Sequence, residues 1–319
     1  MRKTFIAAMV ATIAMPSAGQ AETLEFTAGG LGGGWYTMAA GISSLVHEKD
    51  ASVTIKTVTG GGVSNPSKIN SGKSQLGMVQ SIFAVAAVNG TTPFNGKKHG
   101  KLRLVADGLA INYLHMVRAN GDKTDFKGIF TNGRNKIGVA KAGSTDEYSF
   151  RFAMDYYKTS YDALRKSGKI FNAGYTDLAS AFKDNQIDYI FVLLGLPGAM
   201  VIDATQSRKA ELVEFPADLR KKMAADYGYI SRDIPAGTYP RIQGGATKVL
   251  TTSTSLYGSA DASADSIYKV VKNLCENTDR LGSIAKAMAT FDCKNAIGDG
   301  KVPLHAGAAR YYKEKGYLK

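Results

Sequence analysis

The sequence has few of the residues on which catalysis and metal binding usually depend. Its 319 residues include only 2 cysteines, 4 histidines and 1 tryptophan. No two histidines have metal-site spacing, and there is no HExxH, GxSxG or Walker motif. Asp146 and Glu147 are adjacent, so on a helix they would point to different sides and form no general acid–base pair. We therefore expect no catalytic residues, no metal and no cofactor.

Long apolar runs are also missing, except at the N-terminus. No later segment approaches the roughly 20 apolar residues that span a membrane. Arg2 and Lys3 precede the apolar residues 5–15, and Ala21 ends a stretch of small residues. This pattern predicts a signal peptide over residues 1–21, with a retained N-terminal anchor as the alternative. We expect an exported, periplasmic protein whose mature chain begins near Glu22.

Acidic residues are fewer than basic ones, which gives a formal net charge of +13. Removal of Arg2 and Lys3 with the signal peptide would lower this charge to +11. Lysines and arginines are scattered without a basic stripe, so neither their pattern nor export favours nucleic-acid binding. A basic surface weakly attracts small anions, although it is equally typical of an alkaline soluble protein.

Cys275 and Cys293 lie close together near the C-terminus. An even cysteine count in an oxidising compartment predicts a disulfide between them, and two reduced buried thiols are the alternative. A structural role fits this pair, because the sequence has no CxxC motif of the redox type.

Strand and helix patterns alternate along the chain, which predicts an α/β protein with mainly parallel sheets. A helix–turn–strand pattern at residues 68–81 occurs again at 181–194 and indicates two similar lobes, although any two such units look alike. We expect one lobe to contain residues 22–114 and 251–319 and the other residues 115–250. We expect two separate strands, 102–109 and 113–118. The chain would pass from the first lobe to the second for the first time between them. Segments 113–118 and 247–252 would act as hinges.

Three glycine-led turns are expected to precede helices at the edges of the two sheets. They contain Gly34-Trp35-Tyr36, Gly62 to Asn65, and Gly143-Ser144-Thr145. Helix N-termini present free backbone N–H groups that bind anions. Ordinary helix capping is the better explanation for each turn alone, but three such turns around one cleft favour a shared ligand. Gln80, Ser81 and Gly195 follow strands, at the sheet edge where open α/β proteins bind ligands.

Several longer motifs resemble the extracytoplasmic solute receptors of the TAXI family, which serve tripartite TRAP transporters. The matching segments are PLHAGAARYYKEKG at residues 303–316, IPAGTYP at 234–240, NSG at 70–72, GMVQS at 77–81 and GLP at 195–197. The resemblance implies a two-lobed periplasmic binding protein fold of type II with a ligand cleft between the lobes. It also implies that Tyr36, Asn65, Gln80 and Ser144 contact a small carboxylate ligand.

The sequence departs from the family pattern at three of these turns. Trp35-Tyr36 replaces a double tyrosine, and Gly61 to Asn65 lacks a hydroxyl and a carboxylate of the family's turn. Thr145-Asp146 places an aspartate where the family has a threonine. Trp35 and Thr145 are further candidate contacts. Asp146 would repel a second carboxylate or attract an ammonium group if it entered the cleft.

These observations predict a monomeric periplasmic receptor that passes a small carboxylate to TRAP permease subunits. Glutamate, glutamine and 2-oxoglutarate are the ligands that the resemblance favours. An exported hydrolase using the same cleft, and a ligand-sensing receptor for a membrane kinase, remain the alternatives.

Overall fold

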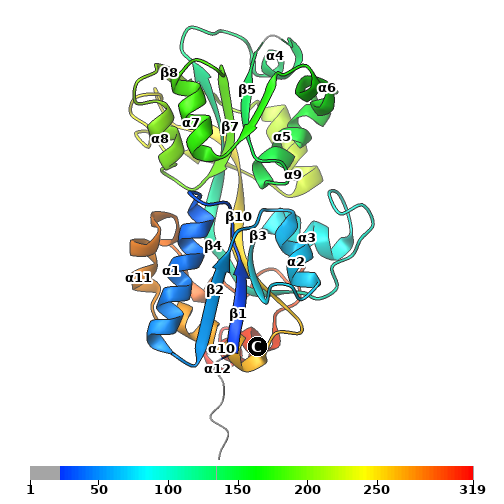
Figure 1. The fold of residues 1–319 in the computed structure, drawn as a ribbon, viewed down its shortest axis with the longest axis vertical. Coiled ribbons are helices and arrows are strands. Elements are labelled where there is room, and N and C mark those ends of the chain that lie inside the picture. Colours follow the sequence, from blue (N-terminus) through cyan, green and yellow to red (C-terminus); the bar gives the residue numbers. More distant parts are fainter. Residues whose placement is uncertain (1–21, 134, 319) are drawn as a thin grey trace, which may run out of the picture.

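The computed structural model describes residues 22–133 and 135–318, so the predicted signal peptide lies outside the described residues. The strands form a sheet with the order β2-β1-β3-β10-β4-β7-β5-β6, to which β8 and β9 add at β4 and β10. The molecule has two lobes stacked along its long axis (Figure 1). The predicted α/β class and two-lobed architecture are therefore confirmed.

The first lobe is built on three parallel strands, each followed by a helix. These elements are β1 (Glu22–Thr27), α1 (Gly34–Lys49), β2 (Val53–Val58), α2 (Ser64–Asn70), β3 (Leu76–Gln80) and α3 (Ser81–Asn89). All five residues of β3 are buried, because helices cover both faces of the sheet at this strand. The carboxyl ends of these strands point toward the second lobe (Figure 1).

The second lobe repeats this construction around the parallel strands β5, β6 and β7. Its elements are α4 (Phe126–Thr131), β5 (Ile137–Ala140), α5 (Thr145–Tyr156), α6 (Tyr161–Lys166), β6 (Ile170–Ala173), α7 (Tyr175–Lys183), β7 (Tyr189–Leu194), α8 (Ala199–Ala204), β8 (Ala210–Leu212), α9 (Ala217–Tyr227) and β9 (Ile230–Ile234).

Two long antiparallel strands, β4 (Leu102–Ala119) and β10 (Thr247–Ser259), run through both lobes (Figure 1). β4 pairs with β10 in its first part and with β7 of the second lobe from Tyr113 onward. The expectation of two strands separated at residues 110–112 is wrong, because β4 is continuous there. Its polar Asn112 is paired within the protein and does not interrupt the strand. The lobe boundaries near residues 114 and 250 stay a prediction.

The chain ends on the first lobe with α10 (Ala264–Cys275), α11 (Thr278–Ile284), the short 3-10 helices η1 (Lys286–Met288) and η2 (Cys293–Asn295), and α12 (Ala306–Glu314). In α10 the buried residues Ile267, Val270, Val271 and Leu274 follow the spacing of one helix face. Cys275 and Cys293 are joined by a disulfide with a Cα–Cα distance of 5.6 Å.

The apolar residues form two core clusters that do not coincide with the two lobes. One lies under α1, α10 and α12 in the first lobe. The other fills the second lobe and continues into the first lobe under α3. Phe83 of α3 connects the lobes here, with its ring centroid 5.8 Å from that of Tyr148 and 6.4 Å from that of Phe152, both on α5.

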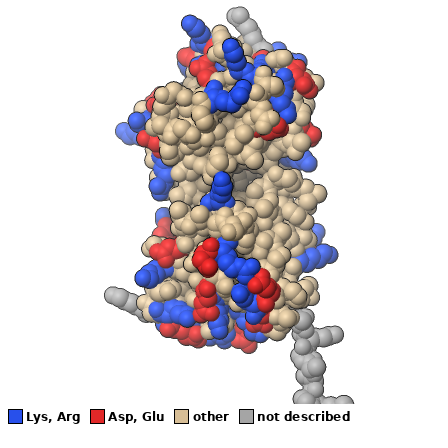
Figure 2. Space-filling model, turned by 90° about the vertical axis from the view of Figure 1, so that its left-hand side faces the viewer, with Lys and Arg blue, Asp and Glu red and all other residues tan. Residues whose placement is uncertain are grey.

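None of the helices in the described part of the chain is long and apolar enough to cross a membrane. Figure 2 shows one side of the molecule, where most charged side chains lie toward the two ends. The middle of this side, where the lobes meet, carries few charges and is hollowed.

Candidate ligand-binding site

A buried polar network lies where the first lobe meets the two crossing strands. Trp35, in the first turn of α1, donates a 2.8 Å hydrogen bond from Nε1 to Oγ1 of Thr254 on β10. Thr254 in turn donates a 2.5 Å bond to Oδ1 of Asn112 on β4. The Nε2 group of Gln80, at the end of β3, lies 3.3 Å from Oδ1 of Asn112 and 3.2 Å from Oγ1 of Thr254. Two predicted site residues, Trp35 and Gln80, therefore meet in one network.

The other amide atom of Gln80 distinguishes this network from ordinary core packing. The Gln80 side chain is buried, and its Oε1 atom has no hydrogen-bond partner among the described residues. A buried acceptor without a partner costs about 1–3 kcal/mol. A ligand that donates a hydrogen bond to Oε1 would remove this cost, so the site is suited to a ligand with an N–H or O–H group.

Asn65 lies nearby, but the protein itself occupies its amide. Its Oδ1 accepts hydrogen bonds from Oγ1 of Thr27 and from N of Gly61, both at 2.9 Å. Its Nδ2 donates to the carbonyl oxygens of Ala28 and Met78 at 2.6 and 2.8 Å. In this structure Asn65 fixes the turns that follow the first strands and has no free polar group for a ligand.

Across the cleft, Ser144 and Glu147 cap the first turn of α5. Oγ of Ser144 accepts a 3.2 Å hydrogen bond from N of Glu147, and Oε2 of Glu147 accepts a 3.0 Å bond from N of Gly143. The Ser144 bond is an ordinary N-cap interaction, whereas Glu147 bonds to the residue before the N-cap and not to Ser144 N as in a capping box. The Ser144 side chain therefore already bonds one of the backbone N–H groups at the helix N-terminus that the sequence predicted to bind an anion.

Asp146 is directed into the second lobe. Its Oδ1 accepts a 2.8 Å hydrogen bond from N of Leu193 on β7, and the Tyr175 hydroxyl donates to the same carboxylate at 3.2 Å. Burial raises the pKa of the Asp146 carboxyl group to about 6, although these hydrogen bonds oppose the shift. Asp146 therefore connects α5 to β7 and α7, and both of its partners belong to its own lobe.

The glycine turns of the two lobes touch each other, so the predicted cleft is narrow here. N of Val63 lies 3.4 Å from the carbonyl oxygen of Gly143. A Cβ atom at Gly62 would overlap Oγ1 of the buried Thr145, and one at Gly33 would lie 3.3 Å from the Tyr175 ring. These close approaches depend on the absence of side chains at the glycines.

Gly195 makes a similar contact after β7. A Cβ atom at this position would lie 2.8 Å from Cβ of Ala287 in η1 of the first lobe. The predicted residue Tyr36 is half-buried and packs against the core cluster under α1.

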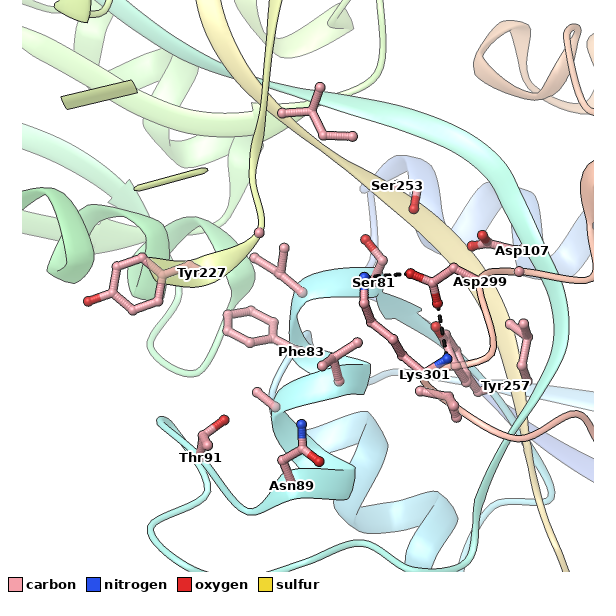
Figure 3. A pocket seen from close by; sticks show the side chains of 18 of the residues that line it. Ser81, Phe83, Asn89, Thr91, Asp107, Tyr227, Ser253, Tyr257, Asp299 and Lys301 are labelled. Atoms are coloured by element: carbon pink, nitrogen blue, oxygen red, sulfur yellow. Dashed lines mark hydrogen bonds and ion pairs between the residues drawn. The ribbon is translucent and has the colours of Figure 1, made fainter. Parts of the chain in front are cut away.

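Ser81 follows Gln80 but belongs to a different part of the lobe junction. Its Oγ lies 3.2 Å from Oγ1 of Thr252 on β10. Ser81 also lines a cavity of about 560 Å³ between α3, the two crossing strands and the end of α9. Figure 3 shows Ser81, Asp107, Ser253, Asp299 and Lys301 at one end of this cavity and Phe83 and Tyr227 at the other.

Three residues of the site were not predicted from the sequence: Asn112, Thr254 and Tyr175. Asn112 and Thr254 are both buried polar residues on strands, with 6% and 0% of their surface exposed. Asn112 could have been recognised in the sequence as a polar residue within an otherwise apolar strand. Tyr175 follows the end of β6, the same kind of position that identified Gln80 and Gly195.

No metal site accompanies the network. Across residues 22–133 and 135–318, no group of three or more His, Cys, Asp or Glu side chains could hold a metal ion.

Comparison with known proteins gives the family. A family model described as the NMT1-like family matches residues 26–316, nearly the whole described chain. The chain belongs to the NMT1-like family. The match includes both lobes and both crossing strands of this NMT1-like protein, and so all the residues of the network.

Solved structures of low sequence identity share the fold of this NMT1-like chain. MatC from Rhodopseudomonas palustris with bound malate is 14% identical and has a TM-score of 0.51, with 92% of this chain and 97% of that chain covered. The periplasmic binding protein BugD is 10% identical and has a TM-score of 0.52, with 93% and 98% covered. At this identity the likeness establishes the two-lobed periplasmic binding protein fold.

Proposed function

We propose that this protein is a periplasmic solute receptor that captures a small carboxylate between its lobes for uptake by a TRAP-type transporter. The fold supports this proposal, and so do the tail and turn motifs that resemble TAXI-family receptors. MatC, which shares the fold, was solved with the dicarboxylate malate bound. The receptor acts as a monomer, and ligand-dependent closure of its lobes forms the surface that the permease recognises.

The ligand site lies at the junction of the lobes. It contains Trp35, Tyr36 and the Gln80 network on one side, and Ser144, Thr145 and Gly195 on the other. Ser81 lies at its border. Backbone N–H groups of the glycine turns other than those of Gly61, Val63 and Gly143, which are bonded within the protein, bind the ligand carboxylate, as helix N-termini commonly do. Asn65 and Asp146 support the two walls through the hydrogen bonds described above.

The unpaired Oε1 of Gln80 is the single observation that carries the choice of ligand. An ammonium group is a strong donor for a buried amide oxygen, whereas the keto group of 2-oxoglutarate has no proton to donate. We therefore place an amino acid such as glutamate or glutamine ahead of 2-oxoglutarate. Asp146 plays no direct part in this selection, because Leu193 and Tyr175 occupy its carboxylate.

Calorimetry with L-glutamate, L-glutamine and 2-oxoglutarate tests the proposal on the mature chain. The Gln80→Met variant should lose about 10- to 100-fold in affinity for the amino acid, the value of a hydrogen bond to a charged group. Its affinity for 2-oxoglutarate should change much less. The control Asp146→Asn should leave the ratio of the two affinities unchanged. A keto-acid preference in the parent, unaffected by Gln80→Met, would contradict the amino-acid assignment.

Recovery of the ligand after incubation tests the receptor function itself. A receptor returns its ligand unaltered and gains thermal stability from it by mass action. Release of a chemically altered product would instead indicate the exported hydrolase.

A further inference from the structure

The cavity beside α3 is separate from the network around Gln80 and is formed by both lobes. Its volume of about 560 Å³ lies within the range of roughly 300–1,000 Å³ that small-molecule sites occupy. Ser81 on α3 and Ser253 on β10 line it from the first lobe, and Tyr227 on α9 lines it from the second.

One end of the cavity carries a carboxylate without a cationic partner. Asp107 of β4 is half-buried, and its Oδ1 accepts a hydrogen bond from the Ser255 hydroxyl. Within the described part of the chain, Asp107 forms no ion pair. The two other carboxylates of the lining are neutralised, since Asp226 lies 2.7 Å from Lys222 and Asp299 lies 2.6 Å from Lys301. The charge left over in the cavity is negative, although the whole chain carries +13.

The negative charge affects the pKa of the neighbouring Tyr257 hydroxyl. Burial raises the pKa of Tyr257, and the charges of Asp107 and Asp299 raise it further. A cation bound at this end of the cavity would balance the unpaired negative charge of Asp107.

The opposite end of the cavity is aromatic and lies where the two lobes meet. Phe152 stacks on Tyr227 with a centroid distance of 3.8 Å and an interplanar angle of 9°. Both rings belong to the second lobe, and Phe83 from α3 of the first lobe contacts one of them, Phe152. Aromatic faces attract cations and bury apolar groups. Figure 3 shows Phe83 and Tyr227 across the cavity from Asp107 and Asp299.

We propose that this cavity binds a small organic ammonium compound, with its nitrogen at Asp107 and its apolar body against Phe83 and Tyr227. The bound amine contacts both lobes and so favours the lobe arrangement seen here. By linkage it also strengthens binding of any ligand that prefers this arrangement. Its contacts Asp107, Phe83 and Tyr227 are distinct from the Gln80 network, although Ser81 borders both sites.

Calorimetry on the mature chain with butylamine, 2-phenylethylamine and tryptamine at neutral pH tests for the site. We expect 2-phenylethylamine to bind about tenfold or more tightly than its uncharged analogue 2-phenylethanol. Asp107→Asn should remove this preference, and the asparagine Oδ1 can still accept from Ser255. The control Asp226→Asn should keep it, because Asp226 is exposed and paired with Lys222.

The proposal is overturned if none of the three amines binds, if the alcohol binds as tightly as the amine, or if the two Asp variants behave alike. The contact with the second lobe has its own test. Tyr227→Ala should weaken amine binding about fivefold or more, whereas Tyr227→Phe should not. An unchanged affinity in Tyr227→Ala would overturn the bridging of the lobes. All these readouts concern amines alone, so they succeed or fail separately from the carboxylate experiments.

Discussion

Trp35 and Thr254 are 219 residues apart in the sequence, yet the indole Nε1 of one donates a 2.8 Å hydrogen bond to the hydroxyl of the other. This bond connects the first turn of α1 to the strand that returns from the second lobe. The same hydroxyl also bonds to Asn112 on the outgoing strand. The candidate ligand turn and both crossing strands are thus connected by hydrogen bonds.

Substitution of Gly62 by alanine should open the lobes. Its Cβ atom would overlap Oγ1 of Thr145 and lie 3.0 Å from the Thr145 nitrogen. Overpacking of this kind costs about 1–3 kcal/mol, which corresponds to roughly a 5- to 150-fold shift toward open forms. Small-angle X-ray scattering should show a larger radius of gyration. Gly30→Ala is the matched control, because its Cβ atom would meet nothing within 4 Å. Identical scattering from both variants would contradict this expectation.

Tyr239 in the IPAGTYP segment should matter for stability. Its hydroxyl accepts a 2.7 Å hydrogen bond from N of Gly198 and lies 2.8 Å from Nε2 of His115. Burial lowers the pKa of His115 to about 4, so the ring is neutral at neutral pH and Nε2 can accept from Tyr239. Tyr239→Phe leaves two buried groups unpaired and should lower the free energy of unfolding by about 2–4 kcal/mol.

Urea denaturation measures this change. Tyr268→Phe is the control, because the Tyr268 hydroxyl bonds to Glu314 at an exposed site and its loss should cost within about 0.5 kcal/mol. If both variants lost the same free energy of unfolding, the buried hydrogen bonds of Tyr239 would contribute no more to stability than the exposed bond of Tyr268.

Asp146 should give the stability a distinctive pH dependence. Its pKa is about 6 in the folded protein, above the ordinary value of 3.8. The folded state therefore holds the proton more tightly, and the parent loses stability as the pH rises between about pH 4 and pH 6. Relative to Asp146→Asn, this loss should reach roughly 3 kcal/mol and then stay constant at higher pH.

Urea denaturation of parent and variant across this range and at neutral pH gives the difference directly. Other titrating groups contribute equally to both proteins and cancel. A difference that is independent of pH would show that Asp146 titrates normally.

The disulfide should stabilise the first lobe without affecting the ligand site. Cys275 and Cys293 are 18 residues apart and lie at the end of α10 and the start of η2. Replacing both by serine should cost about 3 kcal/mol in denaturant unfolding, and reductant should have a similar effect on the parent. Carboxylate binding measured by calorimetry should remain the same. A loss of affinity in the folded double variant would mean that the disulfide also shapes the site.

Local sequence patterns predicted the elements whose formation depends on nearby residues. Buried residues spaced along one face of α10, and the glycine-led turn before α1, are visible without knowledge of the rest of the chain. The continuity of β4 was not predictable in this way. Asn112 resembles a break in an apolar segment, but its partner Thr254 lies 142 residues away and makes the polar side chain compatible with a buried strand.

The same limit applies to the site. Gln80 could be proposed because it ends a strand, whereas the direction of Asp146 depends on a backbone N–H of β7 that no local pattern reveals. The cavity beside α3 was also beyond prediction. Ser81, Tyr227 and Lys301 line it together, and they come from three distant parts of the sequence.

The position of β10 between β3 and β4 has a consequence for the order in which the molecule can form. The strands β4, β5, β6 and β7 are all available once the chain has been synthesised as far as residue 194. The sheet of the first lobe must wait for residues 247–259, which join β3 to β4. The sheet of the first lobe, although its first strands are encoded first, is therefore completed last. Until residues 247–259 have been synthesised, β3 lacks its partner strand β10 and this edge of the sheet stays unpaired.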